Sequence, residues 1–113
     1  MPHIRIDCSD DIFNDVEIQC FVDNIHQSVI ASGLFKTERV KTRCFPTPYY
    51  CVGEAAKKYI HVEIRIRPGR NVEQKRLLSN SLRNTIVQSG LIFDVVTIEV
   101  NEIDMGAYVS HNV

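Results

Sequence analysis

Pro2 is the residue with the clearest chemical potential in this chain. It follows Met1, and removal of that methionine leaves a free secondary amine at the N-terminus. An α-amino group ordinarily titrates at about pH 7.7–8.0. Burial or neighbouring cations lower that pKa, which gives a neutral base at working pH. The plainer interpretation is that Pro2 is only a common residue behind an initiator methionine, and its position alone favours this interpretation.

The cysteines and histidines give weaker signals. The chain has four of each. The cysteines form no CxxC pair and lie among apolar residues, which favours buried free thiols. The histidines lack the spacing of a zinc site. The sequence therefore predicts no metal site, and it leaves a Cys–His nucleophile pair open. The cysteines are Cys8, Cys20, Cys44 and Cys51.

Length and charge narrow the class of protein. The 113 residues, 1–113, fit a single small domain, which gains stability by forming oligomers. The net charge of −1, from 13 basic and 14 acidic residues, argues against a nucleic-acid partner. No apolar run reaches the roughly 18 residues of a membrane span, so we expect no membrane partner. The charged, alternating N-terminus does not resemble a signal peptide, which favours a cytoplasmic protein.

The first half of the chain predicts a strand, a helix and a second strand. Residues 2–8 alternate between apolar and polar side chains. Apolar residues at helical spacing predict a helix over about 15–32, which Gly33 ends. A strand follows, and because Lys41 and Arg43 are two residues apart they lie on one of its faces.

The second half repeats the pattern. Residues 59–67 alternate strictly, and the turn at 68–70 leads to a helix that Asn71 can cap and Gly90 ends. A last strand is predicted over about 95–100. Between the halves, prolines and glycine in residues 46–58 break regular structure and indicate a connecting loop or short hairpin.

The two halves, about 2–45 and 59–101, therefore correspond as repeats. Helices of this length suit a parallel crossover between strands. The sequence predicts an α/β (α+β) fold: a duplicated β-α-β unit with a four-stranded mixed sheet and both helices on one face. The other face is polar and either faces solvent or meets other subunits. It carries Arg5, Asp7, Lys41, Arg43, Glu63, Arg65, Arg67, Thr97 and Glu99.

Three stretches resemble a known family. Met1-Pro2-His3, continuing to Cys8-Ser9-Asp10 and Ile12, resembles the opening of the 5-carboxymethyl-2-hydroxymuconate isomerase family of the tautomerase superfamily. Residues 68–75 resemble that superfamily's glycine–arginine turn and the helix after it. Residues 31–35 and 40–43 resemble its Gly-[IL]-Phe segment and its cation-bearing strand.

The resemblance implies a tautomerase/MIF-like homotrimer, with the polar sheet faces lining a central barrel. It implies a cofactor-independent isomerase of bacterial aromatic-compound catabolism, which moves a proton on an unsaturated 2-hydroxy or 2-keto di- or tricarboxylate. Pro2 is then the general acid/base, and Arg43, Arg70 and Lys41 bind the carboxylate substrate. Lys41 departs from the family, which usually has arginine there, and a lysine offers a point charge rather than a bidentate fork.

Three alternatives stay open. The nearest is a related member of the superfamily that acts on a different unsaturated keto acid. The second is a trimeric binding protein that has kept the fold and lost the chemistry. The third is a ferredoxin-like ligand-binding or regulatory domain, which shares two β-α-β-type units, needs no free proline amine and predicts a monomer or a dimer.

Overall fold

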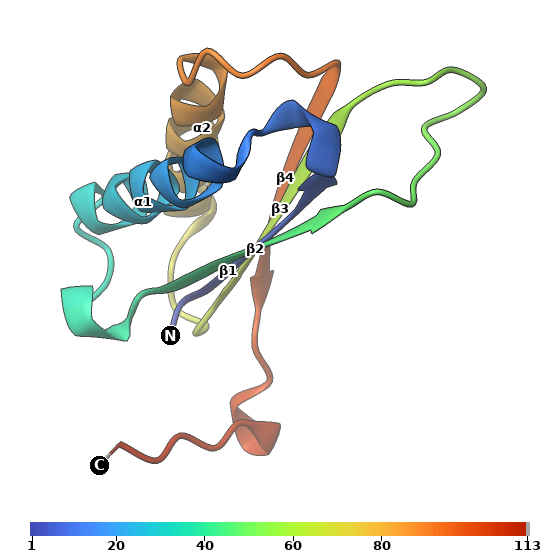
Figure 1. Ribbon diagram of the computed structural model, residues 1–113. Coiled ribbons are helices and arrows are strands. Elements are labelled where there is room, and N and C mark those ends of the chain that lie inside the picture. The colour runs from blue at the N-terminus through green and yellow to red at the C-terminus, as the bar shows by residue number, and fades with distance from the viewer. Residues whose placement is uncertain (113) are drawn as a thin grey trace.

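Four strands form one mixed sheet in the order β2–β1–β3–β4 (Figure 1). The computed structural model describes residues 1–112, apart from the side chains of residues 15 and 16. In chain order, the elements are β1 (His3–Ser9), α1 (Asp15–Ala31), β2 (Lys41–Thr47), β3 (Tyr59–Ile66), α2 (Val72–Val87) and β4 (Val95–Glu102). Short 3₁₀ turns precede α1 and β2 and follow β4.

The pairing of the strands confirms the duplicated unit. β1 pairs in parallel with β2, and β3 pairs in parallel with β4. The two units then join through β1 and β3, which run antiparallel with Ile4 opposite Ile64. Each parallel pair is connected through a helix, so the predicted fold, a four-stranded mixed sheet built from two β-α-β units, is correct.

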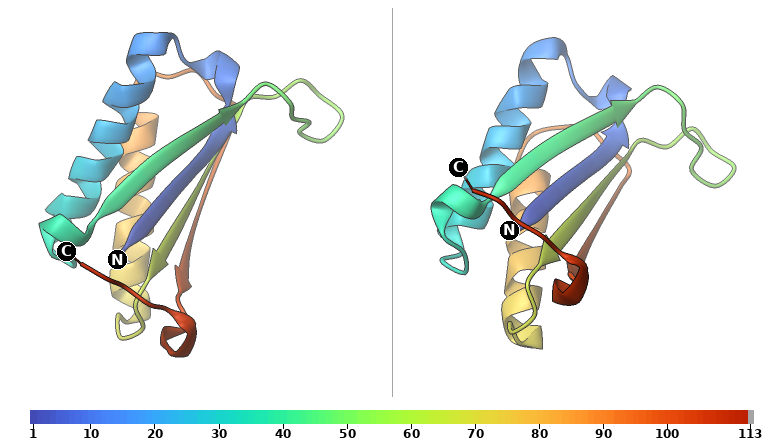
Figure 2. Two further views of the ribbon diagram at one scale, coloured as in Figure 1. Left: turned by 60° about the horizontal axis from the view of Figure 1, so that its bottom comes forward. Right: turned by 90° about the horizontal axis from the view of Figure 1, so that it is seen from below.

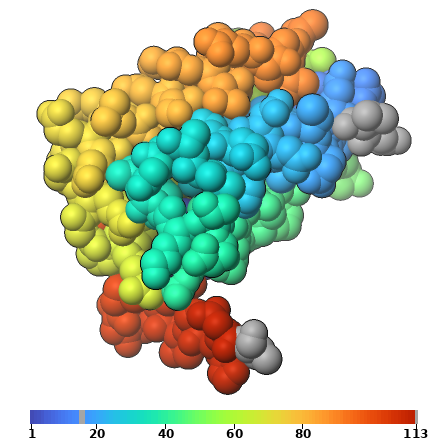
Figure 3. Space-filling model, turned by 90° about the vertical axis from the view of Figure 1, so that its left-hand side faces the viewer, coloured from blue at the N-terminus to red at the C-terminus, as the bar shows by residue number. Residues whose placement is uncertain are grey.

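Both helices cover the same face of the sheet, as predicted (Figure 1). Figure 3 shows them side by side, α1 in blue to cyan and α2 in yellow to orange. Between helices and sheet lies the core, because alternate residues of the central strands point towards the helices. Its fully buried members include Ile4, Ile6, Ile25, Val29, Ile60, Val62, Ile64, Leu78, Leu82 and Ile86.

The helices begin with the same local chemistry. Asn14 accepts from the backbone N–H of Glu17, whose carboxylate accepts from the Asn14 N–H, and Asn71 and Gln74 form the same reciprocal pair. Such capping boxes satisfy N–H groups that have no partner inside the helix. Asn71 therefore caps α2 as predicted, and this cap fixes where the chain leaves the turn that carries Arg70.

The segment between the two units is partly a strand. β2 continues through Pro46 to Thr47, whereas the sequence predicted that the loop begins at residue 46. Proline is tolerated there because β2 is an edge strand. The remaining loop projects from the molecule (Figure 1) and contains one short bridge, between Val52 and Ala55. The sequence predicted a connecting loop or a short hairpin, and the segment is a loop that holds this single bridge.

The polar face of the sheet carries the predicted charges, and some of them pair. Arg5 and Asp7 form an ion pair of 3.2 Å, and His61 lies 3.3 Å from Glu99. Arg67, which was expected on this face, lies just beyond the end of β3 and lines a cleft described below. Within residues 1–112 no helix is both long and apolar enough to span a membrane.

The four cysteines are free thiols, as predicted, but they are not all buried. Cys8 lies in the core, Cys44 is half-buried, and Cys20 and Cys51 are exposed. The prediction of four buried thiols is wrong for the last two because Cys20 lies on the solvent side of α1 and Cys51 lies in the projecting loop.

Candidate active site

The N-terminal end of β1 is held inside the sheet. The Pro2 side chain is fully buried, and its carbonyl accepts a hydrogen bond of 3.1 Å from the Lys41 backbone N–H. β2 and β3 lie on either side of β1. The register pairs His3 with Lys41 on one side and with Arg65 on the other. If this register continues for two residues towards the N-terminus, Met1 lies between Arg39, which precedes β2, and Arg67, which follows β3.

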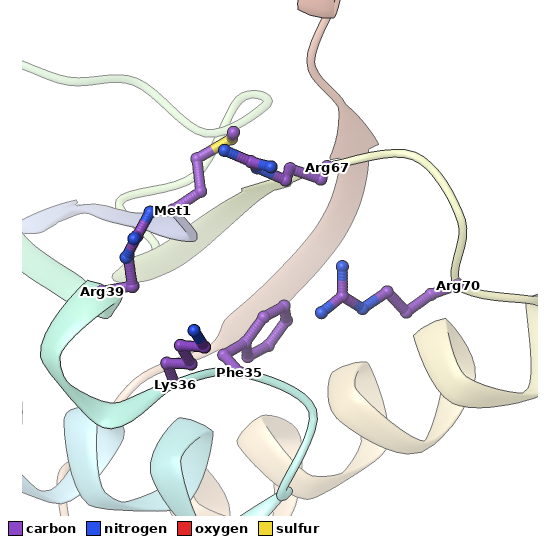
Figure 4. Close-up of a pocket in the computed structure, with 6 residues that line it drawn as sticks. All are labelled: Met1, Phe35, Lys36, Arg39, Arg67 and Arg70. Carbon is purple, nitrogen blue, oxygen red and sulfur yellow. The ribbon is translucent and has the colours of Figure 1, made fainter. Parts of the chain in front are cut away.

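A cleft of about 230 Å³ opens at this end of the sheet (Figure 4). Its wall combines the chain start, the segment before β2 and the turn before α2, so three distant parts of the sequence meet there. Four cations and one aromatic ring surround the first residue, which gives the cleft a strongly positive lining. The lining residues are Met1, Phe35, Lys36, Arg39, Arg67 and Arg70.

The amine of Met1 is electrostatically tuned at this position. Its pKa is lowered from 8.0 to about 6, first by burial and then by the neighbouring Lys41, Arg39 and Arg67 cations. These charges disfavour the protonated ammonium, so the amine is neutral near pH 7. The ion pairs among the described residues join other side chains. A carboxylate ligand is therefore the natural partner for the cations of the cleft.

Arg70 is fixed at the cleft wall. Its guanidinium donates a 2.6 Å hydrogen bond to the Leu34 carbonyl and lies 4.9 Å from the centre of the Phe35 ring. A charged donor on an aromatic face is held by both contacts. Gly69, with φ +122°, allows the turn that presents Arg70 just before the N-terminus of α2. Helix N-termini favour anions, which adds to the charge of Arg70.

Arg43 extends over the polar face of the sheet. It donates to Nδ1 of His3 at 3.4 Å, so the proton on the ring is on Nε2, which donates to the Tyr108 hydroxyl at 2.9 Å. Burial, followed by the N-terminal amine, Arg43 and Lys41, lowers the pKa of His3, which keeps this imidazole neutral. The C-terminal tail passes close to the N-terminus (Figure 2), and Tyr108 on this tail contacts His3.

Of the four predicted residues, Arg70 lines the cleft. Pro2 follows Met1, which lines it, and the Pro2 side chain is buried beside it. Lys41 lies close enough to lower the pKa of the Met1 amine. Arg43 contacts His3 on the neighbouring face instead. Arg39 and Lys36 were missed because they precede the strand and carry no periodic signal. Extending the parallel register by two residues would have revealed Arg39.

A family model matches residues 2–104 of the chain, and it describes 5-carboxymethyl-2-hydroxymuconate isomerase. The chain belongs to this family. A curated relative, the 5-carboxymethyl-2-hydroxymuconate Delta-isomerase of Escherichia coli, is 22% identical over 78 residues. That match spans 67% of this chain and 62% of the E. coli protein.

Solved structures share the fold of this family member. A 5-carboxymethyl-2-hydroxymuconate isomerase from Deinococcus radiodurans R1 has a TM-score of 0.80 at 17% identity, covering 99% of this chain and 90% of that one. FG41 malonate semialdehyde decarboxylase has a TM-score of 0.77 at 15% identity, and the match covers 96% of this chain and 88% of that one. A fused 4-OT symmetric trimer has a TM-score of 0.76 at 10% identity, and the match covers 89% of this chain and 86% of that one. At these identities the likeness shows a tautomerase fold.

Proposed function

We propose that this protein is a cofactor-independent isomerase of the 5-carboxymethyl-2-hydroxymuconate type. Its substrate is an unsaturated 2-hydroxy or 2-keto di- or tricarboxylate from the breakdown of aromatic compounds. The observation that carries this proposal is the cationic cleft around the start of the chain, where the pKa of the Met1 amine is lowered to about 6. Membership of the family supports an isomerase, and the substrate and the acid–base residue are part of the proposal.

The amine supplies the proton transfer. Once Met1 is removed, the α-amine is that of Pro2, at the same end of β1 and among the same cations. Its neutral nitrogen takes a proton from a carbon whose anion is delocalised into a carbonyl group. The resulting ammonium returns the proton at another carbon of the same conjugated system. Proton transfer by a positioned group contributes roughly 10²–10⁴-fold to the rate.

The cations bind and stabilise the anionic substrate. Arg39 and Arg67 flank the amine, and guanidinium groups bind carboxylates through paired hydrogen bonds. Lys41 adds a point charge beside the reacting nitrogen. As the proton leaves, negative charge develops on the substrate oxygen, and these fixed cations stabilise it more than the neutral ground state. Arg70 and Phe35 form the opposite wall and orient the rest of the molecule.

Replacement of Pro2 tests the proposal directly. In the processed chain, Pro2→Ala should lower turnover roughly 10²-fold or more, because the ring that fixes the secondary amine at the strand end is lost. The measurement is an ultraviolet assay of isomerisation with hydroxymuconate-type substrates, alongside circular dichroism. Pro48→Ala, in the exposed loop, is the matched control and should retain full activity. Full activity of Pro2→Ala would remove the proline from the mechanism.

A second candidate is the same proton chemistry on another unsaturated keto acid. Lys41 favours it, because a point charge at this position relaxes the carboxylate geometry that an arginine fork would impose. A substrate panel that varies the number of carboxylates separates the two candidates. The N-terminal mass of the native protein separates both from a non-catalytic binding protein, since a retained Met1 converts the Pro2 nitrogen into an amide without basicity.

A further inference from the structure

Two thiols meet at the far end of the parallel strand pair. The sulfur atoms of Cys8 and Cys44 lie 3.7 Å apart, although 36 residues separate them in the chain. Cys8 is on β1 and is fully buried, and Cys44 is on the edge strand β2 and is half-buried. Both side chains face the helices, and Cys8 lies six residues beyond Pro2 along β1. The proton transfer proposed above does not use them.

The two sulfurs differ in their environment, so that one can react with an oxidant first and the other can then form a disulfide with it. The two sulfurs lie within hydrogen-bond distance, and either thiol can donate. The contact with Cys44 and burial raise the pKa of Cys8, which is fully buried, whereas Cys44 is only half-buried. Because an anion is better solvated at the sulfur nearer to solvent, the thiolate forms preferentially on Cys44. Oxidation-sensitive cysteines share this combination of thiolate character, access and a resolving partner.

We infer that Cys44 and Cys8 form an oxidation site for hydroperoxides. The Cys44 sulfur attacks the peroxide, the O–O bond breaks, and the products are a sulfenic acid on Cys44 and one molecule of water or alcohol. The Cys8 sulfur then attacks the Cys44 sulfur, the S–O bond breaks, and the Cys8 proton leaves with the hydroxide as water. The peroxide gains two electrons, and the two thiols lose them as one disulfide.

The local backbone allows the sulfurs to approach. A disulfide requires the Sγ–Sγ distance to shorten from 3.7 Å to about 2.05 Å. β2 is an edge strand of the sheet, and Pro46, which lies opposite Cys8 in the register, has no N–H for the ladder. This end of β2 is therefore held less tightly than a central strand.

The chain contains its own controls. Cys20 and Cys51 are exposed thiols on α1 and in the projecting loop. They are more accessible than Cys44, so simple access predicts that they are oxidised first. The proposed site predicts the opposite order, because only a thiolate beside a resolving thiol proceeds rapidly to a disulfide.

The experiment treats the reduced, folded protein with stoichiometric hydrogen peroxide, then blocks remaining thiols with iodoacetamide in denaturant. Peptide mass mapping should show a Cys8–Cys44 disulfide, lighter by two hydrogen atoms, with Cys20 and Cys51 alkylated. The double variant Cys20→Ser/Cys51→Ser should form the same disulfide at the same rate. Cys44→Ser should leave Cys8 fully alkylated.

A second variant identifies the sulfur that reacts first. In Cys8→Ala the sulfenic acid on Cys44 has no resolving partner, so dimedone should label Cys44 there and leave it unlabelled in the wild type. If Cys8→Ala does not fold, the mapping of the wild type and of the Cys20→Ser/Cys51→Ser variant decides. Oxidation of Cys20 or Cys51 ahead of the pair, or Cys44 sulfinic acid beside a free Cys8 thiol, would overturn the inference.

Discussion

At the scale of single residues, the surroundings of the chain start disfavour a protonated amine. An ordinary α-amine is mostly protonated at pH 7, and burial together with three nearby cations lowers the pKa of the Met1 amine to about 6. In the proposed mechanism, the charges that lower the pKa of the amine also bind the anionic substrate, so base strength and substrate binding would be coupled at this site.

Replacing Lys41 should expose this coupling. Lys41→Met removes one cation that lowers the pKa of the amine, so that pKa should rise towards its ordinary value. The amine then becomes protonated at a higher pH, so the acid limb of the kcat/KM profile should move to higher pH. At pH values well below the pKa, activity should fall roughly tenfold for each unit of movement, while activity at high pH is affected less.

The matched control is Lys57→Met, an exposed loop lysine that should leave the limb in place. Because Lys41 is also a proposed binding residue, the decisive measurement is the position of the limb rather than the height of the plateau. An acid limb that stays where it is in Lys41→Met would show that this cation does not set the pKa of the base.

The sequence singled out Pro2 as a potential amine base, and the resemblance to the isomerase family added Lys41, Arg43 and Arg70 as substrate-binding cations. They did not lead to Arg39. An arginine in an irregular segment has no periodicity to interpret, and its position beside Met1 follows only from the pairing of β1 with β2. The sequence likewise offered no sign that Arg43 would bind His3 on the neighbouring face.

At the scale of elements, the fold was largely predictable because local signals agree with one another. Strict alternation in β1 and β3 identifies the buried face, and a capping asparagine and a terminal glycine bound α2. Pro46 shows where this reasoning stops: whether a proline ends a strand depends on whether that strand is at an edge, and the edge is a property of the whole sheet.

The strand ends also make a prediction about binding. Arg39 precedes β2 and Arg67 follows β3, so the two flank the amine from opposite sides. Arg67→Gln should raise KM for dicarboxylate substrates about tenfold or more, with a smaller effect on monocarboxylates, because a paired charge-assisted hydrogen bond is lost. Steady-state kinetics with matched substrates measure this difference, and Arg83→Gln on the exposed side of α2 is the control. Equal losses for both substrate classes would exclude Arg67 from carboxylate binding.

At the scale of the whole molecule, the sheet has one face covered by helices and one face without such cover (Figure 1). The open face carries charged side chains of both signs, some of them paired within the chain. A structure with the same fold is a symmetric trimer. We propose that three copies of this chain assemble with these faces turned inward.

The mass in solution tests this assembly. Sedimentation equilibrium at low salt should give three times the mass of the chain, and the same measurement at high salt should show partial dissociation, because exposed ion pairs are screened. The salt must be one that leaves the helical content of the protein unchanged, so that a lower mass at high salt reports dissociation and not unfolding. A monomer or dimer at all concentrations would overturn the proposed trimer.

The interior position of β1 has a practical consequence for anyone who produces this protein. Because Pro2 is held between two strands, any extra residues fused to the N-terminus must leave through the space between Arg39 and Arg67. An affinity tag or cleavage scar at that end would fill the cleft with polypeptide, and the preparation would look well folded yet bind nothing. The projecting loop around Gly53 is the better position for a handle, since it lies at the opposite end of the strands.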